Sequence, residues 1–378
     1  MKFNFLSKTL SAFGLNVSDS SFKIVGMEKI GADLAIKSYH VTPLPKGMIV
    51  NDTISDLKTF NYLLKTAIEQ PQYGKVGTNY VVASLPESKS FVRVIQIPQM
   101  TQAEAENAVP FEAESFIPLP IDQVYLDWQK IGDNSDLSRL GGRAEADASR
   151  LGGSSPAEAG KMSILIIASP KEFVDKYLEI LDKAGLKTLA LEVESQSAQR
   201  ALIKSVGPEN VLLVNIGSLR TTMMMIEGGN LQFTSSIPIA GNAFTESVAR
   251  ALGVSSAKAE EIKKKVGLNN TTEYPNITTS LLPVLNNLSE EIKNVLKFHS
   301  EHSEKQVSRV ILLGGSARLK NLSEFLSPKL QDSGVKSVEL ADPFQNMSGL
   351  KKPPFDALEA LGFVTTLGLA IRGAEYEI

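Results

Sequence analysis

Residues 211–229 read VLLVNIGSLRTTMMMIEGG. An apolar run that contains Val211 to Val214 and Ile216 leads into a turn at Gly217 and Ser218, and a second apolar run, Thr221 to Ile226, leads away from it. Two such runs joined by a short turn predict a β-hairpin, and the nearly uninterrupted first run predicts a strand buried on both faces. A turn of small, hydroxylated residues can present backbone N–H groups to a phosphate, but it is also common in ordinary hairpins. This stretch alone leaves both interpretations open.

The same pattern occurs near the start of the chain and again near residue 310. Residues 13–26 read FGLNVSDSSFKIVG, so an apolar run leads into a turn at Ser18 to Ser21, and Asn16 corresponds to Asn215. Residues 310–319 read VILLGGSARL, which predicts a buried strand followed by a Gly-Gly-Ser turn and a helix. Three strand-to-turn elements in one chain predict two similar halves that face a shared cleft.

Length and composition narrow the class of protein. The 378 residues suit two lobes of about 150–200 residues each. A net charge of -3 gives no basic excess for nucleic-acid binding, and the absence of cysteine excludes disulfides and cysteine-held metals. The first residues lack the apolar core of a signal peptide, and no apolar run approaches the roughly 18 residues of a membrane span. We therefore expect no direct membrane span.

The middle of the chain has a character of its own. Phe91 to Ile97 alternates between apolar and polar residues, as a half-buried strand does, and Thr101 is placed to cap an acidic helix that ends near Glu114. Residues 132–160 contain SRLGG twice and show no apolar period, which predicts a disordered loop. Strands at Val124 to Lys130 and Ser163 to Ala168 flank this loop. Helices are expected at Thr53–Gln70, Lys171–Ala184, Thr245–Leu252, Ala257–Val266, Leu288–His302 and Phe355–Arg372, the last of them buried.

Three groups of polar residues suggest chemistry but have simpler interpretations. His299 and His302 are three residues apart on one helix, a spacing that allows both to bind one metal ion. No third ligand stands near them in sequence, so we expect surface histidines. The four glutamates of the acidic helix, Glu104, Glu106, Glu112 and Glu114, are expected to form a solvated face. Glu260 and Lys263 lie three residues apart on one helix and, taken alone, predict a surface ion pair.

With these stretches in order, the chain resembles the actin-like ATPase superfamily and, within it, the PilM family of type IV pilus assembly proteins, which is grouped with the division protein FtsA. FGLNVSDSSFK resembles the first phosphate loop, and LLVNIGSLRTT resembles the second. AEEIK is similar to the helix that touches ribose and adenine, and ILLGGSARLKNL is similar to the adenosine motif. Residues 86–128 are similar to a small subdomain shared with FtsA. The resemblance covers nearly all of the chain except 132–160.

The resemblance implies an α/β, actin-like ATPase fold with two lobes, each with a mixed β-sheet and flanking helices, plus a small inserted α/β subdomain. Residues 1–84 with 189–207 and 345–378 would form the first lobe, and 85–188, with the flexible loop 132–160, the inserted subdomain. Residues 208–240 with 306–344 would form the core of the second lobe, and 241–305 its helical part.

The resemblance also implies a nucleotide site for ATP or ADP with Mg²⁺. It places the following residues there: Asn16, Ser18, Asp19, Ser20, Ser21, Lys23, Asn215, Gly217, Ser218, Thr221, Gly241, Asn242, Glu260, Lys263, Gly314, Gly315, Ser316 and Arg318. The family has acids where this chain has Asn16 and Asn215, and a small hydroxylated residue where it has Asp19. An amide supplies no charge to Mg²⁺ and accepts no proton, and a carboxylate repels a phosphate. We therefore expect no hydrolysis, no catalytic residue, and weak or absent nucleotide binding.

The function that the resemblance implies is a cytoplasmic adaptor or scaffold of type IV pilus or related secretion machinery. Such a protein would lie at the cytoplasmic face of the inner membrane and contact other pilus components. A PilN-like inner-membrane protein would place its short cytoplasmic N-terminal segment in a groove beside the inserted subdomain. The alternatives are an active actin-like ATPase, such as a sugar kinase or a filament, and an FtsA-like division protein. The closing GAEYEI at residues 373–378 differs from the membrane-binding helix that ends FtsA.

Deletion of Asn134 to Ala159 tests the loop interpretation. Because this segment has no apolar period, its removal should leave the thermal unfolding midpoint nearly unchanged. A calorimetric midpoint more than about 5 °C lower would show that the segment packs against the folded protein.

Overall fold

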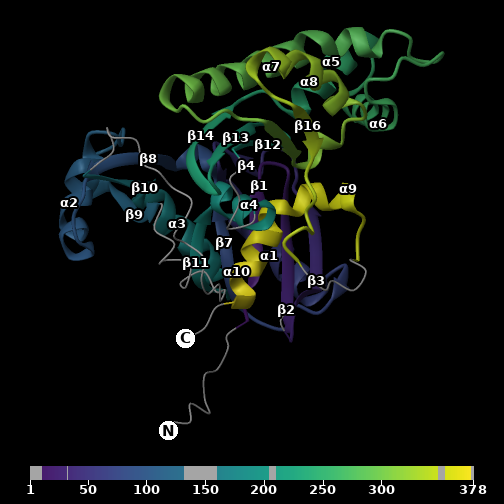
Figure 1. Cartoon of the computed structure of the whole chain (residues 1–378). Helices are drawn as coiled ribbons and strands as arrows, with labels where there is room; N and C mark the ends of the chain where they lie inside the picture. The colour runs from purple at the N-terminus through teal and green to yellow at the C-terminus, as the bar shows by residue number, and fades with distance from the viewer. Residues whose placement is uncertain (1–10, 32, 132–159, 204–209, 348–353, 376–378) are drawn as a thin grey trace. The chain divides into compact units, whose positions relative to one another are not determined.

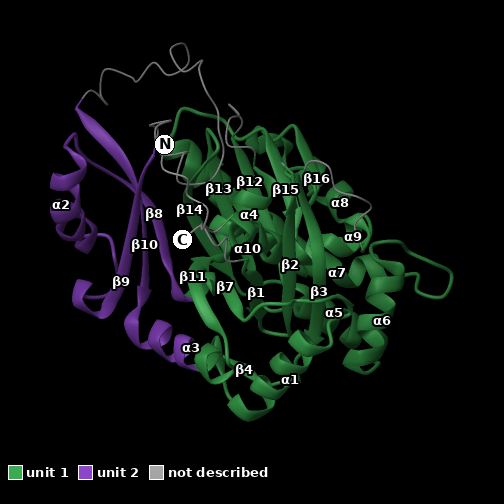
Figure 2. Cartoon of the chain, turned by 90° about the horizontal axis from the view of Figure 1, so that it is seen from below, with its two compact units in different colours: residues 1–88, 180–378 green, residues 89–179 purple. Residues whose placement is uncertain are grey.

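The structure, a computed structural model, describes residues 11–31, 33–131, 160–203, 210–347 and 354–375. The predicted loop 132–160 lies outside this part of the chain except for Gly160. The chain divides into two compact units, coloured in Figure 2. Unit 1 comprises residues 1–88 and 180–378, and unit 2 comprises residues 89–179. The four-part division of the lobes expected from the sequence stays a prediction.

Unit 1 holds most of the regular structure. Its strands are β1 (Phe13–Ser18), β2 (Ser21–Ile30), β3 (Asp33–Pro43), β4 (Ile49–Val50), β5 (Thr53–Ile54), β6 (Tyr73–Gly74), β7 (Tyr80–Leu85), β11 (Lys187–Val193), β12 (Val211–Ile216), β13 (Thr221–Glu227), β14 (Asn230–Ile237), β15 (Arg309–Leu313) and β16 (Ser337–Leu340). Its helices are α1 (Leu57–Glu69), α4 (Glu194–Leu202), α5 (Gly241–Leu252), α6 (Ser256–Val266), α7 (Ile277–His302), α8 (Leu322–Leu330), α9 (Ala357–Ala360) and α10 (Val364–Glu375), with short 3-10 turns η4 (Gly315–Arg318), η5 (Gln331–Ser333) and η6 (Leu361–Phe363).

Two halves of unit 1 share one sheet topology, as the repeated pattern predicts. In the first half the strand order begins β11-β7-β1-β2-β3, and in the second it runs β16-β15-β12-β13-β14. In each half an antiparallel meander of three strands is extended by two parallel strands on the side of its first strand. Since the carboxyl ends of parallel strands meet at one edge of a sheet, each half gathers its turns at one edge.

The hairpin predicted at residues 211–229 is confirmed. β12 and β13 pair antiparallel from Val211↔Ile226 to Ile216↔Thr221, and Gly217 to Arg220 form the turn. β12 is buried from Val211 to Val214, as an apolar strand with neighbours on both faces must be.

One large core lies in the second half. Figure 1 shows α5, α6, α7 and α8 grouped on one side of the strands β12, β13 and β16. Apolar side chains of these helices, such as Phe244, Leu281 and Leu326, pack in one cluster with Leu212 and Met223 of the strands. The helix predicted at Leu288–His302 is longer than expected and begins at Ile277, because apolar residues continue on the same face through Pro283.

The C-terminal apolar segment is buried, as expected, but it is divided into α9, η6 and α10. Ala357–Glu375 is the one stretch of the described residues with the length and hydropathy of a membrane span, and 72% of its apolar window is buried inside the protein. Two glycines allow α10 to lie close to α4 and β1. A Cβ on Gly368 would lie 1.9 Å from the main-chain oxygen of Ser197 in α4, and one on Gly14 would lie 2.6 Å from that of Thr366.

Unit 2 is a small sheet with one well-packed helix. The strands β8 (Phe91–Pro98), β10 (Lys161–Pro170) and β9 (Val124–Ile131) pair antiparallel in that order, and α2 (Gln102–Glu114) and η2 (Ile121–Gln123) precede β9. η1 (Glu87–Lys89) precedes β8, and α3 (Lys171–Lys183) follows β10. Thr101 caps α2 as predicted, and together with Glu104 it forms a capping box.

Other boundaries differ from the sequence predictions for local reasons. Thr53 and Ile54 form β5 rather than the start of a helix, since Asp56 caps α1 by accepting from the Thr59 N–H. The helix expected at Thr245 begins four residues earlier, at Gly241, because the Gly241 and Asn242 N–H groups bond to the turn after β12.

Gly368→Ala should lower the free energy of unfolding by about 3 kcal/mol, because the added methyl group has no room beside Ser197. Gly362→Ala is the matched control, since its nearest atoms would lie at 3.8 and 3.9 Å. Urea unfolding of both variants measures the difference, and equal stabilities would show that α10 and α4 separate at little cost.

Candidate functional site: two facing turns and a buried carboxamide

The first turn of the site joins β1 and β2. Asn16 lies opposite Lys23, and Ser18 lies opposite Ser21, with Asp19 and Ser20 between them. Ser18 donates its hydroxyl to the Ser21 carbonyl oxygen at 2.8 Å, and Lys23 Nζ lies 3.3 Å from Ser21 Oγ. The predicted residues of the first phosphate loop are therefore brought together at one strand end.

Asn16 is buried, with 5% of its surface exposed, and its carboxamide joins three elements. Its Nδ2 donates to Ser84 Oγ at 2.8 Å and to Glu194 Oε1 at 2.9 Å. Ser84 is near the end of β7, and Glu194 is the first residue of α4, directly after β11. Because β1, β7 and β11 run parallel, these three side chains meet at the same edge of the sheet.

The charged groups near Asn16 shift one another's pKa values. Burial raises the pKa of the Glu194 carboxyl to about 7, the Asn16 hydrogen bond and Lys23 oppose this, and the nearby Glu87 and Asp19 carboxyls add to it. Burial lowers the pKa of the Lys23 ammonium to about 8, with Glu194 opposing this shift and Arg318 adding to it. The site thus combines a carboxyl whose pKa is raised with an amine whose pKa is lowered.

Asp19, in the turn itself, is half-buried. Burial and the Asp52 carboxylate raise its pKa, while Arg220 of the second turn lowers it. The two turns therefore interact electrostatically, and Arg220 offsets part of the negative charge that Asp19 brings to the first turn.

The second turn is held by the carbonyl oxygens of Gly217 and Ser218. The Gly217 oxygen accepts from Ser316 Oγ at 2.7 Å and from the Gly241 N–H at 3.1 Å, and the Ser218 oxygen accepts from the Asn242 N–H at 2.8 Å. These bonds bring the turn after β12, the turn after β15 and the start of α5 together. Gly314 has φ +90°, and a Cβ there would lie 2.4 Å from Asn215 Oδ1, so Asn215 faces this turn.

Lys263 and Glu260 form an ion pair of 2.6 Å, but it is not the surface pair expected from sequence. The Lys263 side chain is buried, and Nζ donates to the Gly241 carbonyl oxygen at 3.0 Å and to Thr245 Oγ1 at 2.9 Å. Burial would raise the pKa of Glu260, but hydrogen bonds from Lys263 and Thr245 lower it to about 2. The pair therefore fixes the start of α5 beneath the second turn.

Lys23 of β2 and the turn after β15 both lie next to the segment before α10. The Gly314 N–H donates to the Leu361 carbonyl oxygen at 2.9 Å. A Cβ on Gly362 would lie 3.8 Å from Lys23 Cε and 3.9 Å from Gly315 Cα. Arg318 donates to the Gly315 carbonyl oxygen, and a Cβ on Gly315 would meet open space. Lys23 and Arg318 therefore both adjoin an open backbone turn.

Thr221, a predicted site residue, is buried within the sheet. Its side chain is fully buried, and its hydroxyl donates to the Ile239 carbonyl oxygen at 2.6 Å. In this structure it supports the base of the hairpin.

The resemblance implies Mg²⁺ with ATP or ADP, and at Asn16 the chain has an amide in place of a carboxylate ligand. Mg²⁺ takes oxygen ligands, whereas Asn16 presents N–H groups to Ser84 and Glu194. Within the described ranges no group of three or more His, Cys, Asp or Glu side chains could hold a metal ion.

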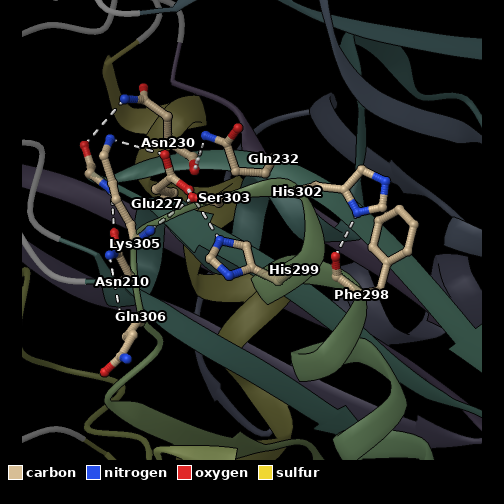
Figure 3. A network of polar contacts seen from close by, with 11 residues as sticks. Asn210, Glu227, Asn230, Gln232, Phe298, His299, His302, Ser303, Lys305 and Gln306 are labelled. Carbon is tan, nitrogen blue, oxygen red and sulfur yellow. Dashed lines mark hydrogen bonds and ion pairs between the residues drawn. The ribbon is translucent and has the colours of Figure 1, made fainter. Parts of the chain in front are cut away.

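The surface interpretation of the histidine pair is wrong for His299. This residue is 4% exposed, and its Nε2 lies 3.1 Å from Glu227 Oε2 (Figure 3). Ser303 and Lys305 also donate to Glu227, and the hydrogen bond from His299 is the largest cause that lowers the pKa of Glu227 to about 2. His302 instead bonds the Phe298 carbonyl oxygen. The network ties the end of α7 to the end of β13 and is separate from the cleft.

Sequence reasoning missed Glu194, Ser84 and Arg220. A usable signal existed for the first two, because each stands at the carboxyl end of a strand in a parallel part of the sheet, where such sites form. Arg220 follows Gly217 in the predicted turn, but nothing in the sequence indicates that it faces Asp19.

A family model described as type IV pilus assembly protein PilM matches residues 14–140 and 145–374. The chain belongs to this family. Its fold is that of the actin-like ATPases, as the resemblance predicts. The structure of a PilM-PilN type IV pilus biogenesis complex has a chain that is 25% identical, with a TM-score of 0.75, and the match covers 97% of this chain and 99% of that chain.

Two further comparisons have lower sequence identity. Cell division protein FtsA of Bacillus subtilis is 24% identical over 263 residues, which cover 66% of this chain and 54% of FtsA, so the match spans about half of that relative. MreB5 of Spiroplasma citri bound to AMPPNP is 12% identical with a TM-score of 0.50, and the match covers 97% of this chain and 95% of that chain. At this identity MreB5 shows the fold alone.

The free energy of unfolding of Glu194→Gln, relative to that of the parent, should increase as pH rises from about 5 to about 8. The increase should reach about 3 kcal/mol. The raised pKa of Glu194 means that the folded parent holds a proton that the unfolded chain releases near pH 4.5, so parent stability falls across this range. Urea unfolding at several pH values measures the difference. Glu69→Gln, an exposed carboxylate of α1, is the control. A pH-independent difference for Glu194→Gln would contradict the assigned environment.

Proposed function

We propose that this chain is a cytoplasmic adaptor of type IV pilus machinery that binds a short cytoplasmic segment of an inner-membrane partner such as PilN. The observation that carries the proposal is membership of the PilM family across nearly the whole chain. The likeness to the chain of a PilM-PilN complex, which extends over 97% of this chain, supports the choice of partner. The adaptor would be held at the inner membrane through that partner and would contact other pilus components.

We further propose that the nucleotide cleft does not hydrolyse ATP. Hydrolysis in this fold needs a carboxylate at the first phosphate loop to act through metal and water. Here that position is Asn16, and its amide is engaged by Glu194 and Ser84. The open turn at Gly315, with Lys23 and Arg318 beside it, supports weak binding of a nucleotide phosphate.

The first test is co-purification with the partner. The full chain should be retained by the cytoplasmic segment of a PilN-like protein, and in the absence of that protein it should stay in the supernatant with anionic vesicles. Strong pelleting without the partner would instead indicate direct membrane attachment, for which residues Phe3, Phe5, Leu6 and Leu10, outside the described ranges, are the candidate stripe.

The second test concerns phosphate charge. ADP should bind at least as tightly as ATP, because the Asp19 carboxylate opposes a further phosphate, and Asp19→Ser should raise ATP affinity about tenfold. Calorimetric titration of the parent, Asp19→Ser and the control Glu69→Gln measures this. Rapid ATP turnover by the parent would overturn the non-hydrolysing assignment.

A third variant restores the family residues. Asn16→Asp, Asn215→Asp and Asp19→Ser together should raise affinity for Mg-ATP above that for ATP in chelator. In the absence of metal the new carboxylate would stand beside Glu194, where Asn16 Nδ2 now lies at 2.9 Å. Stability without metal should therefore fall, and an unchanged unfolding midpoint in chelator would show that Glu194 gains a proton instead.

A further inference from the structure

α2 in unit 2 has one buried side and one acidic, aromatic side. Ala105, Val109 and Ala113 are buried and pack with apolar residues of β8, β10 and β9. At 100° per residue, Phe111 lies about 200° around the helix from Val109, so it points away from this core. Figure 2 shows α2 along the purple sheet of unit 2.

Phe111 is 78% exposed, more than any other large apolar residue in the described part of the chain. Two further apolar residues, Phe116 and Leu119, are 39% and 38% exposed in the segment that follows the helix. Arg93 of β8 lies over the Phe116 ring at 5.6 Å, so an aromatic ring of this segment already accepts a guanidinium.

The charge carried by α2 itself has one sign. Residues 94–129 contain six acidic residues, Glu104, Glu106, Glu112, Glu114, Asp122 and Asp127, and no Lys, Arg or His. The four glutamates of α2 are all exposed, as the sequence predicts. Among the described residues, Glu106, Glu112 and Glu114 form no ion pair within 4 Å. An exposed aromatic ring beside acidic side chains can contact an apolar side chain and a cation of one partner.

We propose that this face of α2, defined by Phe111, Glu104 and Glu114, binds a protein segment in which Lys or Arg residues stand beside apolar residues. Such segments are typical of the cytoplasmic ends of inner-membrane spans. An anionic lipid surface would be repelled by the same carboxylates. A second copy of this chain, meeting by twofold symmetry, would bring like charges together. The charge of the face therefore selects the basic segment among these three occupants.

The proposal goes beyond the groove beside the inserted subdomain that the family resemblance implies. It rests on the proposed adaptor role only for the source of the segment. The two can fail separately, because co-purification with a PilN-like partner tests the adaptor role and the variants of α2 test this surface.

The test uses the full chain and a fluorescein-labelled peptide in which Lys and Arg alternate with Leu, with a counterpart peptide that has Glu in place of every Lys and Arg. Fluorescence anisotropy should show binding of the basic peptide that weakens with added salt. Phe111→Ser should weaken it at least tenfold, and Glu104→Gln with Glu114→Gln should weaken it further. Tyr62→Ser is the matched control, because Tyr62 of α1 is 69% exposed and lies in unit 1. Unchanged unfolding midpoints show that the variants fold.

Four outcomes would overturn the proposal. The basic peptide could bind Phe111→Ser as tightly as the parent, or the Glu counterpart could bind equally well. Pelleting with anionic vesicles that is lost in Phe111→Ser would assign the face to lipid. A dimer in sedimentation analysis that is lost in Phe111→Ser would assign it to a second copy.

Discussion

The candidate site depends on the hydrogen bonds of one buried amide. Asn16 holds Ser84 and Glu194 together at the edge where β1, β7 and β11 end. A carboxylate in its place would stand against the Glu194 carboxylate in a poorly hydrated site, and one of the two would have to take up a proton. The amide is therefore compatible with Glu194 in a way that a carboxylate would not be without a cation between them. This one residue therefore joins the ends of three elements through its hydrogen bonds.

In the second half of unit 1, backbone groups join the separate elements of the site. The Gly217 carbonyl oxygen accepts hydrogen bonds from Ser316 and from the first N–H of α5. The buried Lys263 donates a hydrogen bond to the Gly241 carbonyl oxygen. Motifs that are separated in sequence are thus joined by short, neutral contacts and one ion pair. The second turn therefore keeps its shape through internal hydrogen bonds.

Unit 2 adds a surface of a different kind. Its sheet and the inner side of α2 complete a core, but the outer side combines an exposed Phe111 with carboxylates. In a protein of the PilM family, whose cleft is proposed to be inactive, binding surfaces of this kind would carry the function. The charge of the surface restricts the kind of partner more than its apolar area does, because electrostatic complementarity governs specificity and association rate.

The sequence by itself determined the elements that depend on neighbours along the chain. Apolar runs and turn residues identified the hairpins at residues 13–26 and 211–229, the helix cap at Thr101, and the repetition from which two similar halves follow. Motif order also identified the family. Only the tertiary structure decided which side chains meet: Asn16 with Glu194, 178 residues later, His299 beneath Glu227, and Lys263 under the start of α5. Local periodicity reflects which face of an element is buried, whereas these contacts depend on how the sheets bring distant strand ends together, and that information is spread over the whole chain.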